Sequence, residues 1–87
     1  NKGDWFMFDA ALAAQTLCLA AHALGLGTVH VGNIKHAEVD KLLGLPEDIV
    51  SVEIIPLGYP AQTPDPRPRK EIPEFVFLDR YGQSLDI

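Results

Sequence analysis

The residues best suited to chemistry in this sequence are three cations that lie close together. Arg67, Arg69 and Lys70 fall within four positions and account for three of the seven Lys and Arg residues. The planar guanidinium of arginine presents a fork of donors that suits phosphate oxygens. The usual alternative for such a segment is a solvated basic loop, and these residues alone leave both interpretations open.

Other reactive residue types are sparse. The chain has one cysteine, which excludes an internal disulfide, and its Cys and His residues lack zinc-ligand spacing. Cys18 and His22 lie in an apolar run, where we expect a small buried thiol and a hydrogen-bonded core imidazole. No catalytic acid, base or nucleophile can be named, and no metal site is predicted.

Gly25 and Gly27 do not form a dinucleotide-binding fingerprint. That motif places G-x-G-x-x-G between a strand and a helix, whereas these glycines follow a helical pattern and precede a strand pattern. His30 also stands where the third glycine belongs. Gly25 is better explained as the cap of the preceding helix.

Length and composition indicate one folded domain that needs outside support. The chain has 87 residues, 47% hydrophobic, with a net charge of −5, which argues against disorder and against a broad nucleic-acid interface. No run reaches about 18 consecutive apolar residues, and the N-terminus lacks a signal-peptide pattern, so we expect a cytoplasmic protein with no membrane partner. Because so short a chain buries only about 60% of its unfolded surface, a partner chain or a cofactor is expected.

Two helices are predicted in the first half of the chain. Residues 5–24 form a long apolar pattern with Asp4 as N-cap and Gly25 as C-cap. This pattern is apolar nearly all round, so we expect burial on several sides against a partner. Residues 36–43 form a short helix that Gly44 ends.

Strands and loops complete an α+β pattern. We predict strands at 27–31, 49–57 and 75–78, a Pro-rich loop at 60–70, one turn at 71–74 and a tail at 79–87. Pro56 cannot donate to a ladder, so the second strand ends there, bulges, or lies on an edge.

Taken in order, five short motifs resemble the second half of the FMN-dependent nitroreductase family. They are Asp9 to Thr28, His30-Val31-Gly32-Asn33-Ile34, Leu45-Pro46-Glu47, Pro56-Leu57-Gly58-Tyr59-Pro60, and Arg67-Pro68-Arg69-Lys70 with Arg80-Tyr81-Gly82. Each motif is weak alone, but together they cover almost the whole chain in family order and spacing.

This resemblance implies an α+β sandwich built as an intertwined homodimer with FMN at the dimer interface. Members take hydride from NADH or NADPH onto FMN and pass electrons to nitroaromatics, quinones or related small acceptors. The resemblance further implies that residues 1–87 are the C-terminal portion of a single nitroreductase-like domain. On that basis this chain carries at most half of an FMN site.

The resemblance also implies particular cofactor contacts. Backbone groups of His30, Val31, Gly32 and Asn33 are expected near N5 and O4 of the flavin, with Gly32 and Asn33 as the best donors. Arg67, Arg69 and Lys70 are expected to hold the FMN phosphate, the two arginines above all. The alternative function is a non-catalytic dimerisation module that keeps the long helix and binds no flavin.

Overall fold

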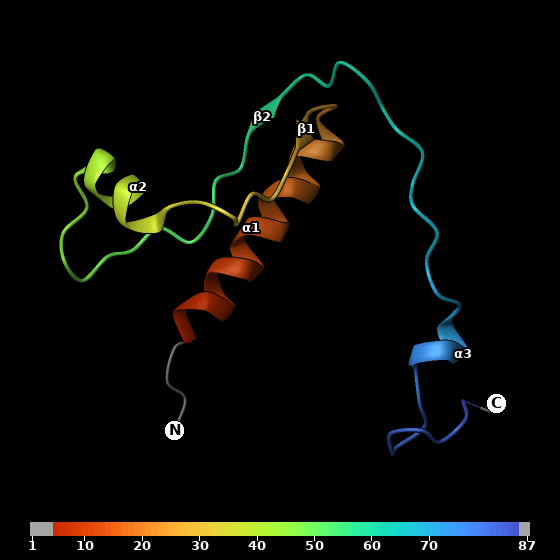
Figure 1. Ribbon diagram of the computed structural model, residues 1–87. Coiled ribbons are helices and arrows are strands. Elements are labelled where there is room, and N and C mark those ends of the chain that lie inside the picture. Colours follow the sequence, from red (N-terminus) through yellow and green to blue (C-terminus); the bar gives the residue numbers. More distant parts are fainter. Residues whose placement is uncertain (1–4, 86–87) are drawn as a thin grey trace.

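The computed structural model describes residues 5–85, and in this range it has an α+β fold with three helices and one small sheet (Figure 1). In chain order the elements are α1 (Trp5–Ala23), β1 (Gly27–Thr28), α2 (His36–Leu43), β2 (Leu57–Gly58) and α3 (Ile72–Phe75). The fold class and both predicted helices of the first half are confirmed. The predicted N-cap, Asp4, lies outside the described residues.

Helix α1 ends as its sequence predicts. Gly25 adopts a left-handed φ of 80°. Its N–H donates to the His22 carbonyl at 3.0 Å, and the Leu26 N–H donates to the Ala21 carbonyl at 2.9 Å. This pair of bonds satisfies carbonyls that the last helical turn leaves free, and glycine takes the left-handed position at low steric cost. The chain then turns back into β1.

The sheet is antiparallel, and one proline interrupts it. The ladder pairs Gly27 with Gly58 and Thr28 with Leu57, and the same register leads to an isolated bridge between Val31 and Ile54. These two bridging residues exchange both backbone bonds at 2.9 Å. Because hydrogen-bonded pairs alternate along an antiparallel ladder, Pro56 falls on a hydrogen-bonding position and cannot donate there.

The interruption explains why the predicted strands at 27–31 and 49–57 are too long. Pairing survives on both sides of Pro56, as a two-residue ladder at one end and a single bridge at the other. Neither strand edge is covered by a further strand within residues 5–85. The bridge at Val31 is therefore the main backbone anchor for the residues that follow it.

Helix α2 is tied to the returning strand segment through Ser51. The Ser51 N–H donates to Asp40 Oδ1 at 2.8 Å, and His36 Nδ1 donates to the Ser51 carbonyl at 2.9 Å. Ser51 lowers the pKa of Asp40 below its usual 3.8, first through its nearby side chain and then through its N–H. The Ser51 Oγ itself has no hydrogen-bond partner among the described residues. Gly44 caps the helix with a φ of 67°.

We expect this tie to weaken only in acid. Because the folded-state pKa of Asp40 is lowered, its stabilising effect is complete above pH 3.8 and is lost as the pH falls through the lowered value. Asp40→Asn should therefore lower the thermal midpoint above pH 3.8, with the difference from the unchanged protein closing in stronger acid. Circular dichroism melts at a series of pH values measure this. A difference that stays constant into strong acid would contradict the assignment.

The C-terminal part folds locally, and the strand predicted at 75–78 is wrong. Helix α3 begins with a capping box in which the Glu71 N–H donates to Glu74 Oε2 at 2.7 Å. After it, Val76 has extended backbone angles, but no strand among residues 5–85 pairs with it. The chain reverses instead, with the Phe77 and Tyr81 rings packed edge to face at 5.0 Å. A local apolar run is not a strand without a partner.

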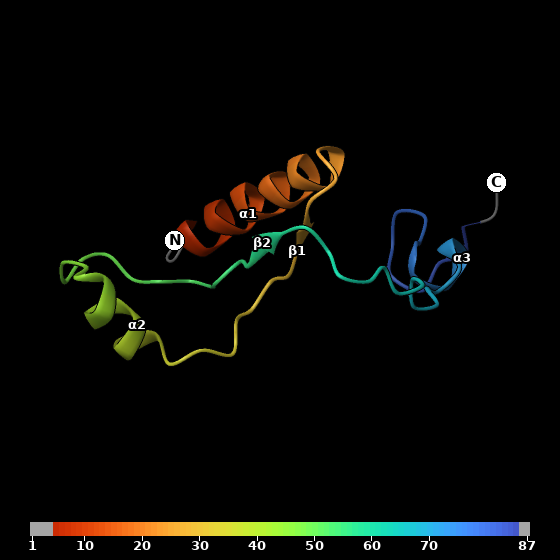
Figure 2. The same cartoon turned by 90° about the horizontal axis from the view of Figure 1, so that it is seen from above.

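The chain is far more open than a self-contained domain of its size. Its radius of gyration is 18.0 Å, whereas about 12 Å is expected for a compact chain of 87 residues. Its accessible surface is 8110 Å², against about 5,000 Å² for a compact monomer of this mass. Figure 2 shows α1, the loop bearing α2 and the α3 region in three separate directions from the small sheet.

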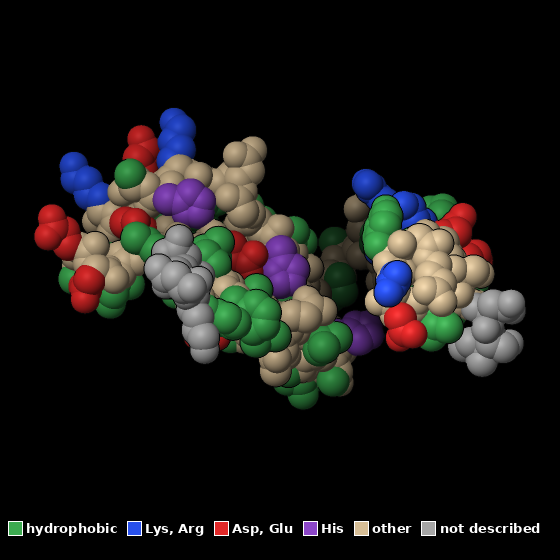
Figure 3. Space-filling model, turned by 90° about the horizontal axis from the view of Figure 1, so that it is seen from below, with side chains coloured by type: hydrophobic (Ala, Val, Ile, Leu, Met, Phe, Trp, Pro, Cys, Tyr) green, Lys and Arg blue, Asp and Glu red, His purple; other side chains and the backbone are tan. Residues whose placement is uncertain are grey.

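The apolar surface of α1 remains open in this chain. Among the described hydrophobic residues only Cys18 and Ala21 are buried, and Figure 3 shows hydrophobic side chains gathered on the face that it presents. The burial of Cys18 is confirmed. His22 is exposed in the described part of the chain, so its prediction as a hydrogen-bonded core residue is wrong.

Helix α1 is also long and apolar enough to cross a membrane, by length and composition alone. A single such helix is weak evidence, because the core helix of a soluble protein satisfies the same criteria.

Candidate functional site

The segment from His30 to Asn33 carries two backbone donors that the rest of the described chain leaves free. Val31 is fixed by the bridge to Ile54, and the Ile34 N–H donates to the Gly32 carbonyl at 3.0 Å. Between these two anchors, the N–H groups of Gly32 and Asn33 have no hydrogen-bond partner among residues 5–85, and both residues are exposed. Two neighbouring N–H groups that are held in place and left free can bind an acceptor.

Gly32 is not required by the chain itself. Its φ is not in the left-handed region, and a Cβ placed there would meet no atom within 4 Å. The open space beside this backbone fits the approach of a flat ligand, so the predicted contact of Gly32 and Asn33 with a flavin is compatible with the structure.

Behind this segment lies a group of side chains that sequence reasoning missed. His30 Nδ1 lies 2.9 Å from Glu53 Oε1, and His30 Nε2 lies 3.1 Å from Gln15 Oε1 and 3.4 Å from Cys18 Sγ. We call these four residues the His30 cluster. The cluster joins α1 to both paired chain segments. It also places the His30 imidazole beside the Cys18 thiol, which the sequence places in an apolar run.

A sequence signal for part of this cluster exists. Glu53 is the charged residue within the alternating run from Val50 to Ile54, and His30 lies in the β-branched run that pairs with it. Once the register is known, the two residues are diagonal neighbours on one face of the ladder. Complementary side chains at such positions interact favourably. The register itself could not be derived from the sequence.

The predicted phosphate-binding cations lie in a separate part of the molecule. Arg67, Arg69 and Lys70 are all exposed on the extended segment between β2 and α3, and Arg69 Nη1 donates to the Arg67 carbonyl at 3.0 Å. Figures 1 and 2 show this segment leading away from β1 and from the loop that follows it. The structure thus keeps the two predicted parts of the cofactor site, the backbone donors and the cations, apart within one chain.

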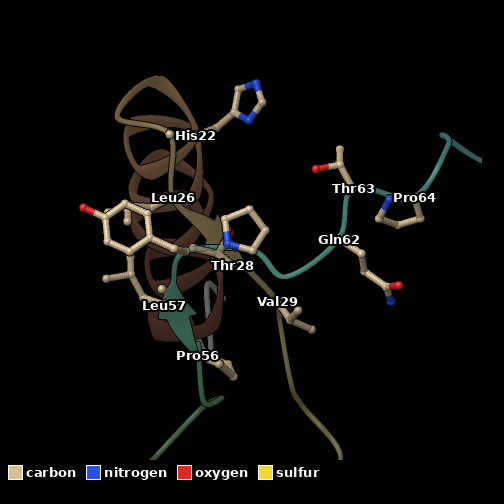
Figure 4. Close-up of a pocket in the computed structure, with 14 residues that line it drawn as sticks. His22, Leu26, Thr28, Val29, Pro56, Leu57, Gln62, Thr63 and Pro64 are labelled. Atoms are coloured by element: carbon tan, nitrogen blue, oxygen red, sulfur yellow. The ribbon is translucent and has the colours of Figure 1, made fainter.

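A hollow beside the sheet does not coincide with either predicted part of the cofactor site. It has a volume of about 740 Å³ and lies between the end of α1, the two strands and the segment that leaves β2 (Figure 4). Figure 4 shows His22 and Leu26 on one side, and Gln62, Thr63 and Pro64 across from them on the outgoing segment. Its lining is mostly apolar. On the segment that follows α1, the last lining residue is Val29, one residue before His30, where the predicted flavin-binding segment begins.

Metal chemistry finds no support in the described chain. Within residues 5–85 no three His, Cys, Asp or Glu side chains are grouped so that they could hold a metal ion. This arrangement of free backbone donors and separate arginines can bind a polar, anionic ligand, but it supplies no obvious acid or base of its own.

Comparison with known proteins gives consistent results. The sequence profile of the nitroreductase family matches residues 1–59. The chain is 43% identical over 81 residues to the NADPH-flavin oxidoreductase of Vibrio harveyi and covers 33% of that protein. It is 38% identical over 80 residues to the oxygen-insensitive NADPH nitroreductase of Salmonella typhimurium, again covering 33% of the relative.

A solved structure agrees with these relatives. A crystal structure from Parabacteroides distasonis, named for NADH dehydrogenase or NAD(P)H nitroreductase activity, superposes with a TM-score of 0.77 at 29% identity. The match covers 93% of this chain and 49% of that one, so the chain spans a third to a half of the relatives that it matches. The aligned profile, the identities and the shared fold together show that this chain belongs to the nitroreductase family.

Proposed function

We propose that this chain forms part of an FMN-dependent oxidoreductase that passes electrons from NADH or NADPH to nitroaromatic, quinone or related small acceptors. The observation that carries the proposal is the pair of free N–H groups on the exposed residues Gly32 and Asn33. Relatives named as an NADPH-flavin oxidoreductase and as an FMN reductase support it. The alternative of a dimerisation module without flavin is not favoured, because these relatives bear the names of reductases.

The chain's own residues would hold the two ends of the cofactor. The N–H groups of Gly32 and Asn33 would donate to acceptors of the flavin ring, with His30 and Val31 supplying the backbone on their N-terminal side. Arg67, Arg69 and Lys70 would bind the phosphate through charge-assisted hydrogen bonds. FMN, when bound, supplies the hydride-accepting and electron-donating chemistry. The described residues position it and neutralise its charge.

A second copy of the chain is the partner that we propose. The exposed apolar side chains of α1 include Leu12 at 56% and Leu19 at 61%, on a helix that a soluble protein would cover. The accessible surface exceeds that of a compact monomer by about 3,000 Å², which is ample for a large obligate interface. A cytoplasmic homodimer that acts on small molecules, without nucleic acid or membrane, is the arrangement that we infer.

The reaction can be tested directly. Purified protein is mixed with FMN under anaerobic conditions, freed from unbound flavin, and titrated with NADPH and separately with NADH. We expect the visible absorbance of the oxidised flavin to disappear with at least one of them and to return when a nitroaromatic or a quinone is added. Protein that retains FMN but is reduced by neither nucleotide would refute the proposed electron transfer.

A further inference from the structure

The His30 cluster adjoins the backbone donors of the candidate site along the chain, because His30 lies two residues before Gly32. His30 precedes Val31, and Glu53 precedes Ile54, so the contact between the two side chains runs alongside the isolated bridge. Gln15 and Cys18, one turn apart on α1, contact the other nitrogen of the ring. The cluster therefore links three chain segments at the point where the chain enters Gly32.

This link matters because backbone pairing is thin at that point. Pro56 breaks the ladder between β2 and the bridge, and a single reciprocal pair of hydrogen bonds holds Val31. A lone bridge fixes the position of one residue but allows the flanking backbone to twist. The side-chain contacts of His30 restrain the residue on the other side of Val31, and so restrict the direction in which the next N–H groups point.

The hydrogen-bond roles in the cluster follow from the partners. Ionised Glu53 can only accept, so His30 Nδ1 carries the proton in the 2.9 Å contact. If Nε2 is also protonated, it donates to Gln15 Oε1; if it is not, the Gln15 amide turns and donates to it. Glu53 therefore fixes the ring in both protonation states. The ring is 44% exposed and the carboxylate 21% exposed, so the pair is only partly screened by water.

We propose that Glu53 and Gln15 are positioning residues that hold His30, and through it the N–H groups of Gly32 and Asn33, in the orientation that the flavin ring requires. The inference rests on the proposed function, since it assigns residues to the ring end of the same site. None of these three side chains needs to touch the flavin. Their effect is exerted on the backbone, which is where the donors are.

The test compares Glu53→Ala, which removes the acceptor, with Glu53→Gln, whose amide oxygen can still accept from Nδ1–H. FMN and riboflavin affinities are measured by quenching of flavin fluorescence, and the two-electron potential is measured at saturating flavin. We expect Glu53→Ala to weaken both flavins equally, by about tenfold, as for the loss of one aligned hydrogen bond. We also expect its potential to become more negative, because misaligned donors stabilise the reduced ring less. Glu53→Gln should recover most of both effects.

Asp48→Ala serves as the matched control, since Asp48 is an exposed carboxylate on the turn after α2. If Glu53→Ala does not fold, Gln15→Ala replaces it, because alanine suits a helical position and Gln15 is exposed. For that variant we expect about a threefold weakening of both flavins, a smaller effect because one of the two ring contacts remains. Unchanged affinity and potential in the folded variant would overturn the positioning role. Failure of the unchanged protein to bind FMN would instead refute the proposed function.

Discussion

Replacing Arg67 and Arg69 together with alanine should lower the affinity for FMN by about a hundredfold and leave the affinity for riboflavin unchanged. Each arginine is exposed and can turn its guanidinium toward a phosphate, although Arg69 now donates to the Arg67 carbonyl. Hydrogen bonds to a charged group contribute about 1.5–3 kcal/mol each, so two of them account for a loss of about 3 kcal/mol or more. Riboflavin lacks the phosphate and reports on the ring end alone.

The control for this pair is Lys41→Ala with Arg80→Ala. It lowers the net charge by the same two units at exposed positions of α2 and of the C-terminal turn. Fluorescence titrations with both flavins distinguish specific contact from general electrostatic attraction. An equal loss of FMN affinity in the control, or an equal loss of riboflavin affinity in the arginine variant, would argue against phosphate binding by this segment.

Asn33→Pro should weaken FMN and riboflavin alike, by about tenfold, while the fold is retained. Ile34 donates to Gly32 across Asn33, and among described non-glycine residues only Asp79 has a positive φ. Asn33 is therefore the centre of an inverse γ-turn. The central φ of such turns is about −75°, close to the φ of about −65° that proline imposes. The substitution removes the N–H donor without forcing a new backbone path.

Asn33→Ala is the matched control, because it removes the side chain and keeps the N–H. We expect flavin affinity in this variant close to that of the unchanged protein. The loss of one backbone hydrogen bond of about 1–1.5 kcal/mol corresponds to about tenfold in affinity. If Asn33→Ala and Asn33→Pro weaken binding equally, the side chain rather than the backbone makes the contact. If neither variant changes it, the ring contact is elsewhere.

The helices could be predicted from the sequence because their signals are local. Helix α2 has the predicted bounds, and α1 ends within one residue of its prediction, since a glycine with positive φ ends each of them. Propensity, apolar spacing and a glycine cap all lie within one stretch of chain. The turn at 71–74 is also predictable from local sequence, because its capping box spans only the four residues from Glu71 to Glu74.

The sheet could be predicted only in outline, because it depends on pairing between distant segments. The β-branched run at 27–31 and the alternating run at 49–57 do lie opposite one another, but where Pro56 falls in the ladder depends on register. The run at 75–78 has the same local pattern and no partner within the described chain. Local sequence could not distinguish these two cases.

The candidate site shows the same division. The family resemblance predicts flavin contacts by Gly32 and Asn33. The structure adds a physical reason, because the N–H groups of both residues are anchored and have no hydrogen-bond partner in the described chain. The His30 cluster joins residues 15 and 23 positions apart in sequence, so no motif could reveal it. We predict that the cations bind the same ligand as these backbone donors. The arginine variant tests the phosphate end of that ligand, and the proline variant tests its ring end.

On the proposed function, this chain contributes both ring contacts and phosphate contacts to an FMN site. The most direct test of this proposal is a titration of the purified protein, stripped of bound flavin, with FMN and in parallel with riboflavin. We predict saturable binding of one FMN per chain, with riboflavin bound measurably more weakly because the arginines have no phosphate to hold. Protein that takes up neither flavin, or binds the two with equal affinity, would contradict this account.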